Sequence, residues 1–94
     1  MVSDLTENML RDRRMIYGPF DDLAQTRQRL QSALMDNPGW PELPPAVREA
    51  ISMITLKLAR AVNGDWRHAD NADDVIGYAM LWRTFLDTEA GRAD

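Results

Sequence analysis

Apolar residues recur at helical spacing through residues 45–62, and this repeat limits the folds open to the chain more than any other feature. The i, i+3, i+4, i+7 pattern of an amphipathic helix runs there without a break. It is carried by Val47, Ala50, Ile51, Ile54, Leu58, Ala61 and Val62. No segment of the chain alternates apolar and polar residues as a half-buried strand does. The sequence therefore predicts an all-α fold.

Turn-forming residues divide the chain into four predicted helices. Proline and glycine end helices because proline lacks an amide hydrogen and glycine tolerates the backbone angles of a helix terminus. Such residues stand at Gly18-Pro19, in residues 37–44 and at Gly64. The predicted elements are helices over 3–17, 21–36, 45–63 and 72–87, a proline-rich connector over 37–44, a polar loop over 64–71 and a frayed tail over 88–94.

Short polar side chains stand at three predicted helix starts, where their oxygens accept hydrogen bonds from unpaired backbone amides. Ser3 and Asp21 are expected to cap the first two helices, and Asp70 or Asn71 the last one. Because the loop over 64–71 is short, helices 45–63 and 72–87 are expected to form an antiparallel hairpin. The predicted fold is a four-helix single domain, residues 1–94, organised on this C-terminal hairpin.

Helix 72–87 is predicted to be apolar on most of its sides. The apolar residues that surround it are Val75, Ile76, Ala79, Trp82, Phe85 and Leu86. Such a helix is usually central in a bundle or lies at a subunit interface. The sequence therefore predicts a homo-oligomer through this helix, and Trp66 in the preceding loop is expected to pack on the hairpin.

Composition excludes several classes of function. The formal net charge of −4 argues against binding duplex nucleic acid, which needs a cationic face. No apolar stretch approaches the roughly 20 residues that span a bilayer, and residues 1–10 lack the pattern of a signal peptide. The chain contains no cysteine, which suits a reducing compartment. These features predict a cytoplasmic protein without a membrane segment.

Two groups of basic residues are candidates for binding phosphate. Lys57 and Arg60 are expected to lie opposite the first turns of helix 72–87, close to Asp73, Asp74 and Tyr78. They form either an ion-pair network that fixes the hairpin or a pair of phosphate ligands.

The second group is at the end of the first helix, where Arg11, Arg13 and Arg14 precede Tyr17-Gly18. This cationic helix end could hold an anion, with Tyr17 stacking on a base. Alternatively, the arginines only complement the negative end of the helix dipole.

Carboxylates near the start of the last helix are candidates for binding Mg²⁺, which prefers oxygen ligands. The candidates are Asp70, Asp73 and Asp74, with Glu49 as a further ligand. The alternative is that the three aspartates cap helix 72–87. Glu49 lies roughly 22 Å along the helix axis from the hairpin loop, so it could meet Asp73 only across a subunit boundary. His68 stands without other histidines or cysteines, which is a poor signal for a metal site.

Several spaced motifs resemble those of a known family. They are Leu56-Lys57-Leu58-Ala59-Arg60, Asn63-Gly64-Asp65 and Asp73-Asp74-Val75-Ile76-Gly77-Tyr78-Ala79, preceded by Arg14, Tyr17-Gly18, Phe20 and Pro38-Gly39-Trp40. In this order they resemble a phage and prophage family of uncharacterised small helical proteins. The resemblance covers roughly residues 11–82. It implies a distant relation to the MazG-like all-α nucleotide pyrophosphohydrolases.

The chain also departs from the pattern of these enzymes, which hold Mg²⁺ with a Glu-x-x-Glu pair and a Glu-x-x-Asp pair. Glu49 has no acidic partner at Ser52 or Met53, and only Asp70 and Asp73 have the second spacing. Pro19 stands where the family usually has an acidic residue, and Ser52 stands where it often has one. These departures favour binding without turnover.

The resemblance implies a phage-type nucleotide-binding protein that is related to the MazG-like enzymes but has lost part of their metal-binding pattern. Its implied role is to sequester a nucleotide or cyclic nucleotide signal and so counteract a host defence system. The expected phosphate and nucleotide ligands are Lys57, Arg60, Arg14, Tyr17 and Tyr78. One alternative is an active Mg²⁺-dependent nucleoside triphosphate pyrophosphohydrolase. A second alternative is an inhibitor or adaptor that binds a host defence protein and has no small-molecule site.

Overall fold

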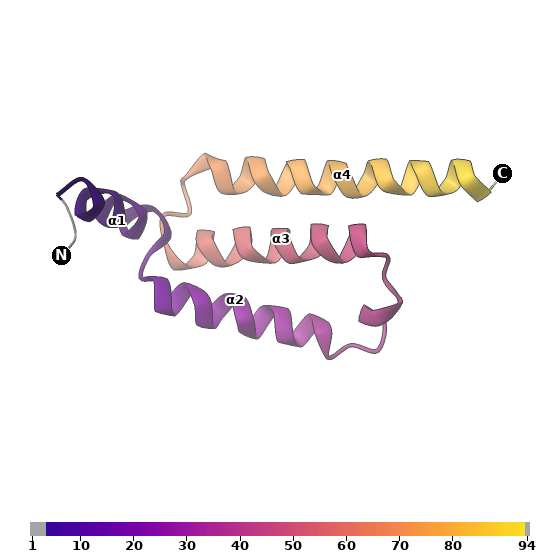
Figure 1. Cartoon of the computed structure of the whole chain (residues 1–94), viewed down its shortest axis with the longest axis horizontal. Helices are drawn as coiled ribbons and strands as arrows, with labels where there is room; N and C mark the ends of the chain where they lie inside the picture. Colours follow the sequence, from indigo (N-terminus) through magenta and orange to yellow (C-terminus); the bar gives the residue numbers. More distant parts are fainter. Residues whose placement is uncertain (1–3, 94) are drawn as a thin grey trace.

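Three of the four α-helices in residues 4–93, the part of the chain that the computed structural model describes, lie side by side in one layer (Figure 1). The helices are α1 (Asp4–Tyr17), α2 (Phe20–Met35), α3 (Pro45–Asn63) and α4 (Ala69–Ala93), with a 3-10 turn η1 (Trp40–Glu42) before α3. α3 lies in the middle of the layer, between α2 and α4, and α1 lies at one end. The predicted all-α fold and the α3–α4 hairpin are confirmed.

The helix bounds follow the turn-forming residues where these are present. α3 has the predicted bounds, with Pro45 in its first turn and Gly64 directly after its last residue. α1 ends at Tyr17 as predicted, and α2 is shifted by one residue from the predicted range. Pro19 occupies the cap position of α2, so the predicted cap at Asp21 is wrong. The predicted cap at Ser3 lies outside the described residues.

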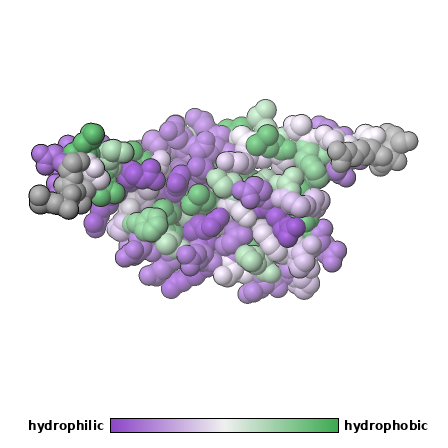
Figure 2. Space-filling model, viewed as in Figure 1, coloured by the Kyte–Doolittle hydropathy of each residue, from purple (hydrophilic) through white to green (hydrophobic). Residues whose placement is uncertain are grey.

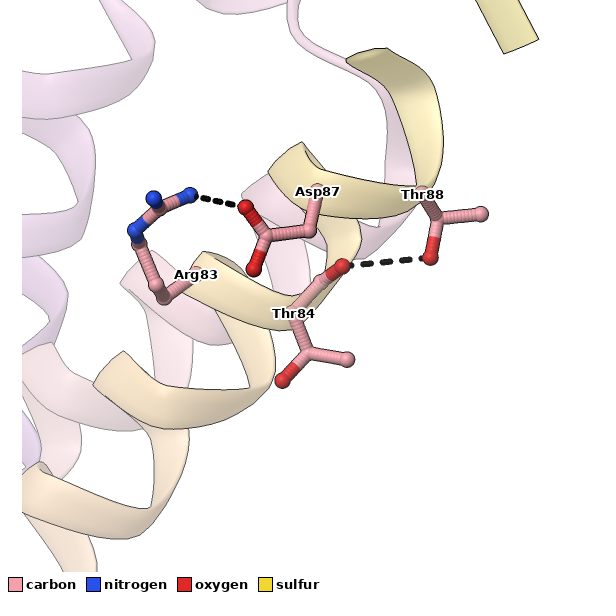
Figure 3. Close-up of polar contacts among 4 residues, drawn as sticks. All are labelled: Arg83, Thr84, Asp87 and Thr88. Atoms are coloured by element: carbon pink, nitrogen blue, oxygen red, sulfur yellow. Dashed lines mark hydrogen bonds and ion pairs between the residues drawn. The ribbon is translucent and has the colours of Figure 1, made fainter. Parts of the chain in front are cut away.

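The predicted bounds of the last helix are wrong at both ends. α4 begins at Ala69, so Asp70 and Asn71 lie within its first turn and do not cap it. It continues to Ala93, so the tail expected to fray is helical over residues 88–93, and Asp94 lies outside the described residues. Local contacts stabilise these last turns (Figure 3): Arg83 pairs with Asp87 one turn later, and the Thr88 hydroxyl donates to the Thr84 carbonyl oxygen.

The central helix of the layer is α3, so of the two places expected for the last helix the centre of the bundle is wrong, and a subunit interface stays a prediction. α3 packs on both α2 and α4, whereas α4 packs mainly on α3. Small residues let the neighbours approach α3 closely, since Ala50 and Ala59 are buried and Ala59 is fully inaccessible to solvent. α4 therefore lies at the edge of the layer, and its outer residues Ile76 and Met80 are exposed.

Few apolar side chains are buried in this layer. Among the described residues the buried apolar side chains are Leu23, Val47, Ala50 and Ala59. Leu58 and Val62, which the helical pattern predicts to be buried, are 50% and 81% exposed. Trp66 is 73% exposed beneath the guanidinium of Arg67, so its expected packing on the hairpin is wrong.

The molecule is elongated, measuring 58 × 26 × 26 Å. Figure 2 shows hydrophobic side chains at the surface among hydrophilic ones, several of them along α4 and near the junction of α1 and α2. In the described part of the chain, no helix combines the length and the apolar character that a bilayer span requires.

Candidate anion-binding site

Two turns meet where α1 joins α2 and α3 joins α4, and their contact positions the candidate site. The Asn63 side-chain amide donates hydrogen bonds to the carbonyl oxygens of Tyr17 (2.8 Å) and Pro19 (3.0 Å). The backbone amide of Asp65 donates to the Ile16 carbonyl oxygen over 2.7 Å. The end of α1, with Tyr17 on it, is thus held against the end of α3.

Two arginines and one histidine, from separate parts of the chain, surround the ring of Tyr17. The guanidinium carbon of Arg13 in α1 is 5.2 Å from the ring centroid, and that of Arg60 in α3 is 4.6 Å away. His68, just before α4, meets the same ring edge-on at 5.9 Å between centroids. Cation–π attraction stabilises both arginines against the ring.

A pocket of about 450 Å³ opens beside this ring. Arg13, Arg14 and Tyr17 line it on the side of α1. The remaining lining residues are Leu10, Gly18, Pro19, Phe20, Asp21 and Leu23. We call Arg13, Arg14, Tyr17, Arg60 and His68 the Tyr17 cluster.

The arginines of the Tyr17 cluster have no carboxylate partner among residues 4–93, whose ion pairs involve other side chains. This is unexpected in a chain with 15 acidic and 11 basic lysine or arginine residues. The Arg60 guanidinium rests on an aromatic face, and its buried Nε makes no hydrogen bond to the described residues. The cluster is therefore a local excess of positive charge on an acidic molecule.

This arrangement has the chemistry to bind a phosphate-bearing ligand. A guanidinium is always charged and presents N–H donors in a fork that matches phosphate oxygens. The Phe20 ring, which also lines the pocket and is 77% exposed, adds aromatic surface on which a base can stack. Asp21 at the pocket edge repels an anion, which confines the favourable region to the side of α1.

Of the five predicted phosphate and nucleotide ligands, the structure brings three together. Arg14 and Tyr17 line the pocket, and Arg60 lies on the Tyr17 ring. Lys57 instead lies in the α3–α4 hairpin, where its Nζ is 2.9 Å from the Asp74 carboxylate. Tyr78 borders a groove of about 410 Å³ with Asp73 and Asp74, away from the Tyr17 cluster.

The predicted metal ligands are dispersed. Asp74 pairs with Lys57, and Asp70 lies 3.4 Å from His68. Glu49 borders a different groove, beside Tyr78, Leu81 and Phe85, as the antiparallel hairpin predicts. Within one chain, no three or more carboxylate, histidine or cysteine side chains of the described residues are grouped closely enough to hold a metal ion. A metal site shared between chains stays a prediction.

Sequence reasoning missed two contributions to this site. His68 is close to Tyr17, although its sequence context indicated only a poor candidate for a metal ligand. Asn63 ties the two turns together, although Asn63-Gly64 indicated only the end of a helix. The Asn63-Gly64 pair was the sequence signal for this contact between the two turns. Gly64 lies so close to the end of α1 that a Cβ on it would overlap the Ile16 carbonyl oxygen.

Comparisons with known proteins assign no family to the chain. No protein-family model matches it, and neither a curated protein nor a solved structure matches it. The resemblance to the phage family and to the MazG-like enzymes therefore stays a prediction from the sequence motifs.

Proposed function

We propose that this protein binds a nucleotide at the Tyr17 cluster and holds it without turnover. The observation that carries the proposal is the pair of arginines, Arg13 and Arg60, on one tyrosine ring beside a pocket and without a carboxylate partner in the described residues. The arginines would bind the phosphate, and the aromatic surface of the pocket would stack on the base. The family resemblance supplies the nucleotide class.

The sequence departures support binding over hydrolysis. Ser52 stands where the MazG-like pattern has the second acid of a metal-binding pair, and Asp74 is engaged with Lys57. A phage-type protein that sequesters a nucleotide signal in anti-defence needs only such binding. In this proposal Lys57 stabilises the α3–α4 hairpin, and the Tyr17 cluster binds the phosphate.

Calorimetric titration and thermal unfolding with nucleoside triphosphates and cyclic di- and trinucleotides, with and without Mg²⁺, test this proposal. A ligand at 100 times its dissociation constant should add about 2.7 kcal/mol to the free energy of unfolding. We expect one such nucleotide to bind and to be recovered chemically unchanged. Arg13→Gln, on an exposed side chain, should weaken binding roughly tenfold or more, because it removes a charge-assisted contact.

Arg29→Gln is the matched control, because Arg29 is an exposed arginine of α2 outside the Tyr17 cluster. It should leave the affinity unchanged. If Arg13→Gln and Arg29→Gln weakened nucleotide binding equally, the result would contradict a binding site at the Tyr17 cluster. Mg²⁺-dependent hydrolysis would contradict binding without turnover and favour the pyrophosphohydrolase. A lack of response to every nucleotide would favour the adaptor of a host defence protein.

A further inference from the structure

α3 carries an apolar seam that its own chain covers only in part. Its residues follow one another in steps of four, three, four and three: Val47, Ile51, Ile54, Leu58 and Ala61. This is the spacing by which one helix packs into the side of another helix. Val62 stands beside the seam in its last turn.

The exposure of the seam rises along the helix. Val47 is buried, Ile51, Ile54 and Ala61 are half-buried, and Leu58 is 50% exposed. Val62 beside it is 81% exposed. α3 already contacts α2 on one side and α4 on the other, so the seam faces away from both neighbours over its second half. The most regular apolar pattern of the chain is thus open to solvent in its last two turns, most of all at Leu58 and the neighbouring Val62.

We infer that a second copy of this chain docks its own α3 on this seam and forms a symmetric dimer. A seam of heptad spacing accepts a helix with the same spacing, and the second copy provides one. No charged residue interrupts the seam from Val47 to Ala61, so two copies can meet without burying an unpaired charge. The small side chain of Ala61 allows close approach of the two backbones.

The accessible surface area of the chain is large enough for a second copy to bury part of it. The accessible surface is 7119 Å², whereas a compact monomer of 10.7 kDa is expected to expose about 5,500 Å². The excess is about 1,600 Å², and a stable interface of standard size buries about 800 Å² from each partner. The chain as a whole therefore exposes more surplus surface than each partner buries in one dimer contact of standard size.

The outer side of α4 is a poorer contact than the α3 seam. Its exposed residues of the same spacing are Ala72, Ile76, Ala79, Arg83 and Leu86, and a neighbouring row runs through Asp73, Met80 and Asp87. Arg83 interrupts the first row and two aspartates interrupt the second, and charged residues are depleted at the centres of interfaces. The inferred dimer thus uses α3 in place of the last helix, through which the sequence predicts an oligomer.

Light scattering coupled to size-exclusion chromatography on the full chain tests the inference. We expect the unmodified chain to have about twice the mass of 10.7 kDa and the double variant Leu58→Glu/Val62→Glu to be monomeric. Both side chains are at least half exposed, and glutamate favours helix. Met80→Glu, on the exposed outer side of α4, is the matched control and should remain dimeric.

A monomeric unmodified chain, or a double variant that remains dimeric, would overturn the inference. Loss of the dimer with Met80→Glu alone would place the contact on α4 instead. If circular dichroism shows that the double variant does not fold, Leu58→Ala/Val62→Ala replaces it. That pair should raise the dimer dissociation constant at least about tenfold, and an unchanged constant would count against the seam.

Discussion

Gly18 holds a backbone conformation that no other residue type adopts at ease. Its φ is +79°, and its amide donates to the Arg14 carbonyl oxygen to close α1. A Cβ on this residue would also overlap the carbonyl oxygen of Asn63. The turn that presents Tyr17 therefore depends on glycine for two separate reasons, backbone angle and close approach.

We predict that Gly18→Ala destabilises the protein by about 2 kcal/mol or more, because the strain of a positive φ adds to the overlap with Asn63. Gly77→Ala is the matched control. Gly77 lies within α4 with no atom near its missing side chain, so alanine should stabilise by about 0.5–1 kcal/mol. Urea unfolding at one fixed protein concentration measures both changes. Equal stabilities of the two variants would contradict the role of the turn.

The membership of the Tyr17 cluster could be predicted only in part from the sequence. Arg14, Tyr17 and Arg60 were identified by residue type and by local context. Their meeting depends on the packing of the α1–α2 turn against Asn63, a contact across 46 residues that no local pattern encodes. The Lys57–Asp74 ion pair, in contrast, agrees with the ion-pair alternative that the hairpin geometry predicted for Lys57.

The α3–α4 hairpin contains an ion pair whose two halves differ in exposure. The Lys57 side chain is 9% exposed, whereas the Asp74 side chain is 47% exposed. If Lys57 is removed, water can still solvate the Asp74 carboxylate. If Asp74 is removed, a buried ammonium group remains without its partner. The two losses should therefore have unequal costs.

We predict that Asp74→Ala destabilises the protein by about 2 kcal/mol and Lys57→Met by less than about 1 kcal/mol. Methionine fills the volume of the lysine stem and leaves no buried charge. Unfolding measurements on both single variants and on the double variant determine the two costs and their coupling. If Lys57→Met were the more damaging change, the ammonium group would have a role beyond this pair, and phosphate binding would be the first to test.

Helix bounds could be predicted where the chain has residues that stop a helix. α3 begins at Pro45 and ends before Gly64, and its bounds were predicted without error. α4 has no proline, and its interior Gly77 and Gly91 do not stop it. Residues 88–94 were expected to fray as a chain end, but residues 88–93 continue the helix, and the Thr88 hydroxyl donates to the Thr84 carbonyl oxygen. Amphipathic patterns thus identified the helices more reliably than their ends.

The whole molecule is too extended for its length. Its radius of gyration is 16.5 Å, whereas a compact domain of 94 residues is expected to have about 12 Å. One layer of three helices cannot enclose a core, so the apolar pattern of α3 is buried only at Val47 and Ala50 and becomes exposed at Leu58 and Val62. The sequence pattern correctly indicated an apolar stripe, but it could not indicate whether the same chain or a second copy covers it.

The Tyr17 cluster and the α3 seam lie on different sides of α3. Arg60 is two residues from Leu58 and from Val62, and residues two apart on a helix do not share a face. A dimer through the seam therefore leaves the cluster of each copy open. We predict that the dimer binds one nucleotide per chain and that Leu58→Glu/Val62→Glu changes the affinity less than about threefold.

Calorimetric titration of the dimer and of the monomeric variant measures both stoichiometry and affinity. One ligand for every two chains would mean that the second copy contributes to the site or blocks its equivalent. A large loss of affinity in the monomer would have the same meaning, provided that circular dichroism shows the variant to be folded. Equal binding by both forms would show that one chain contains the whole site, from α1 to the turn before α4.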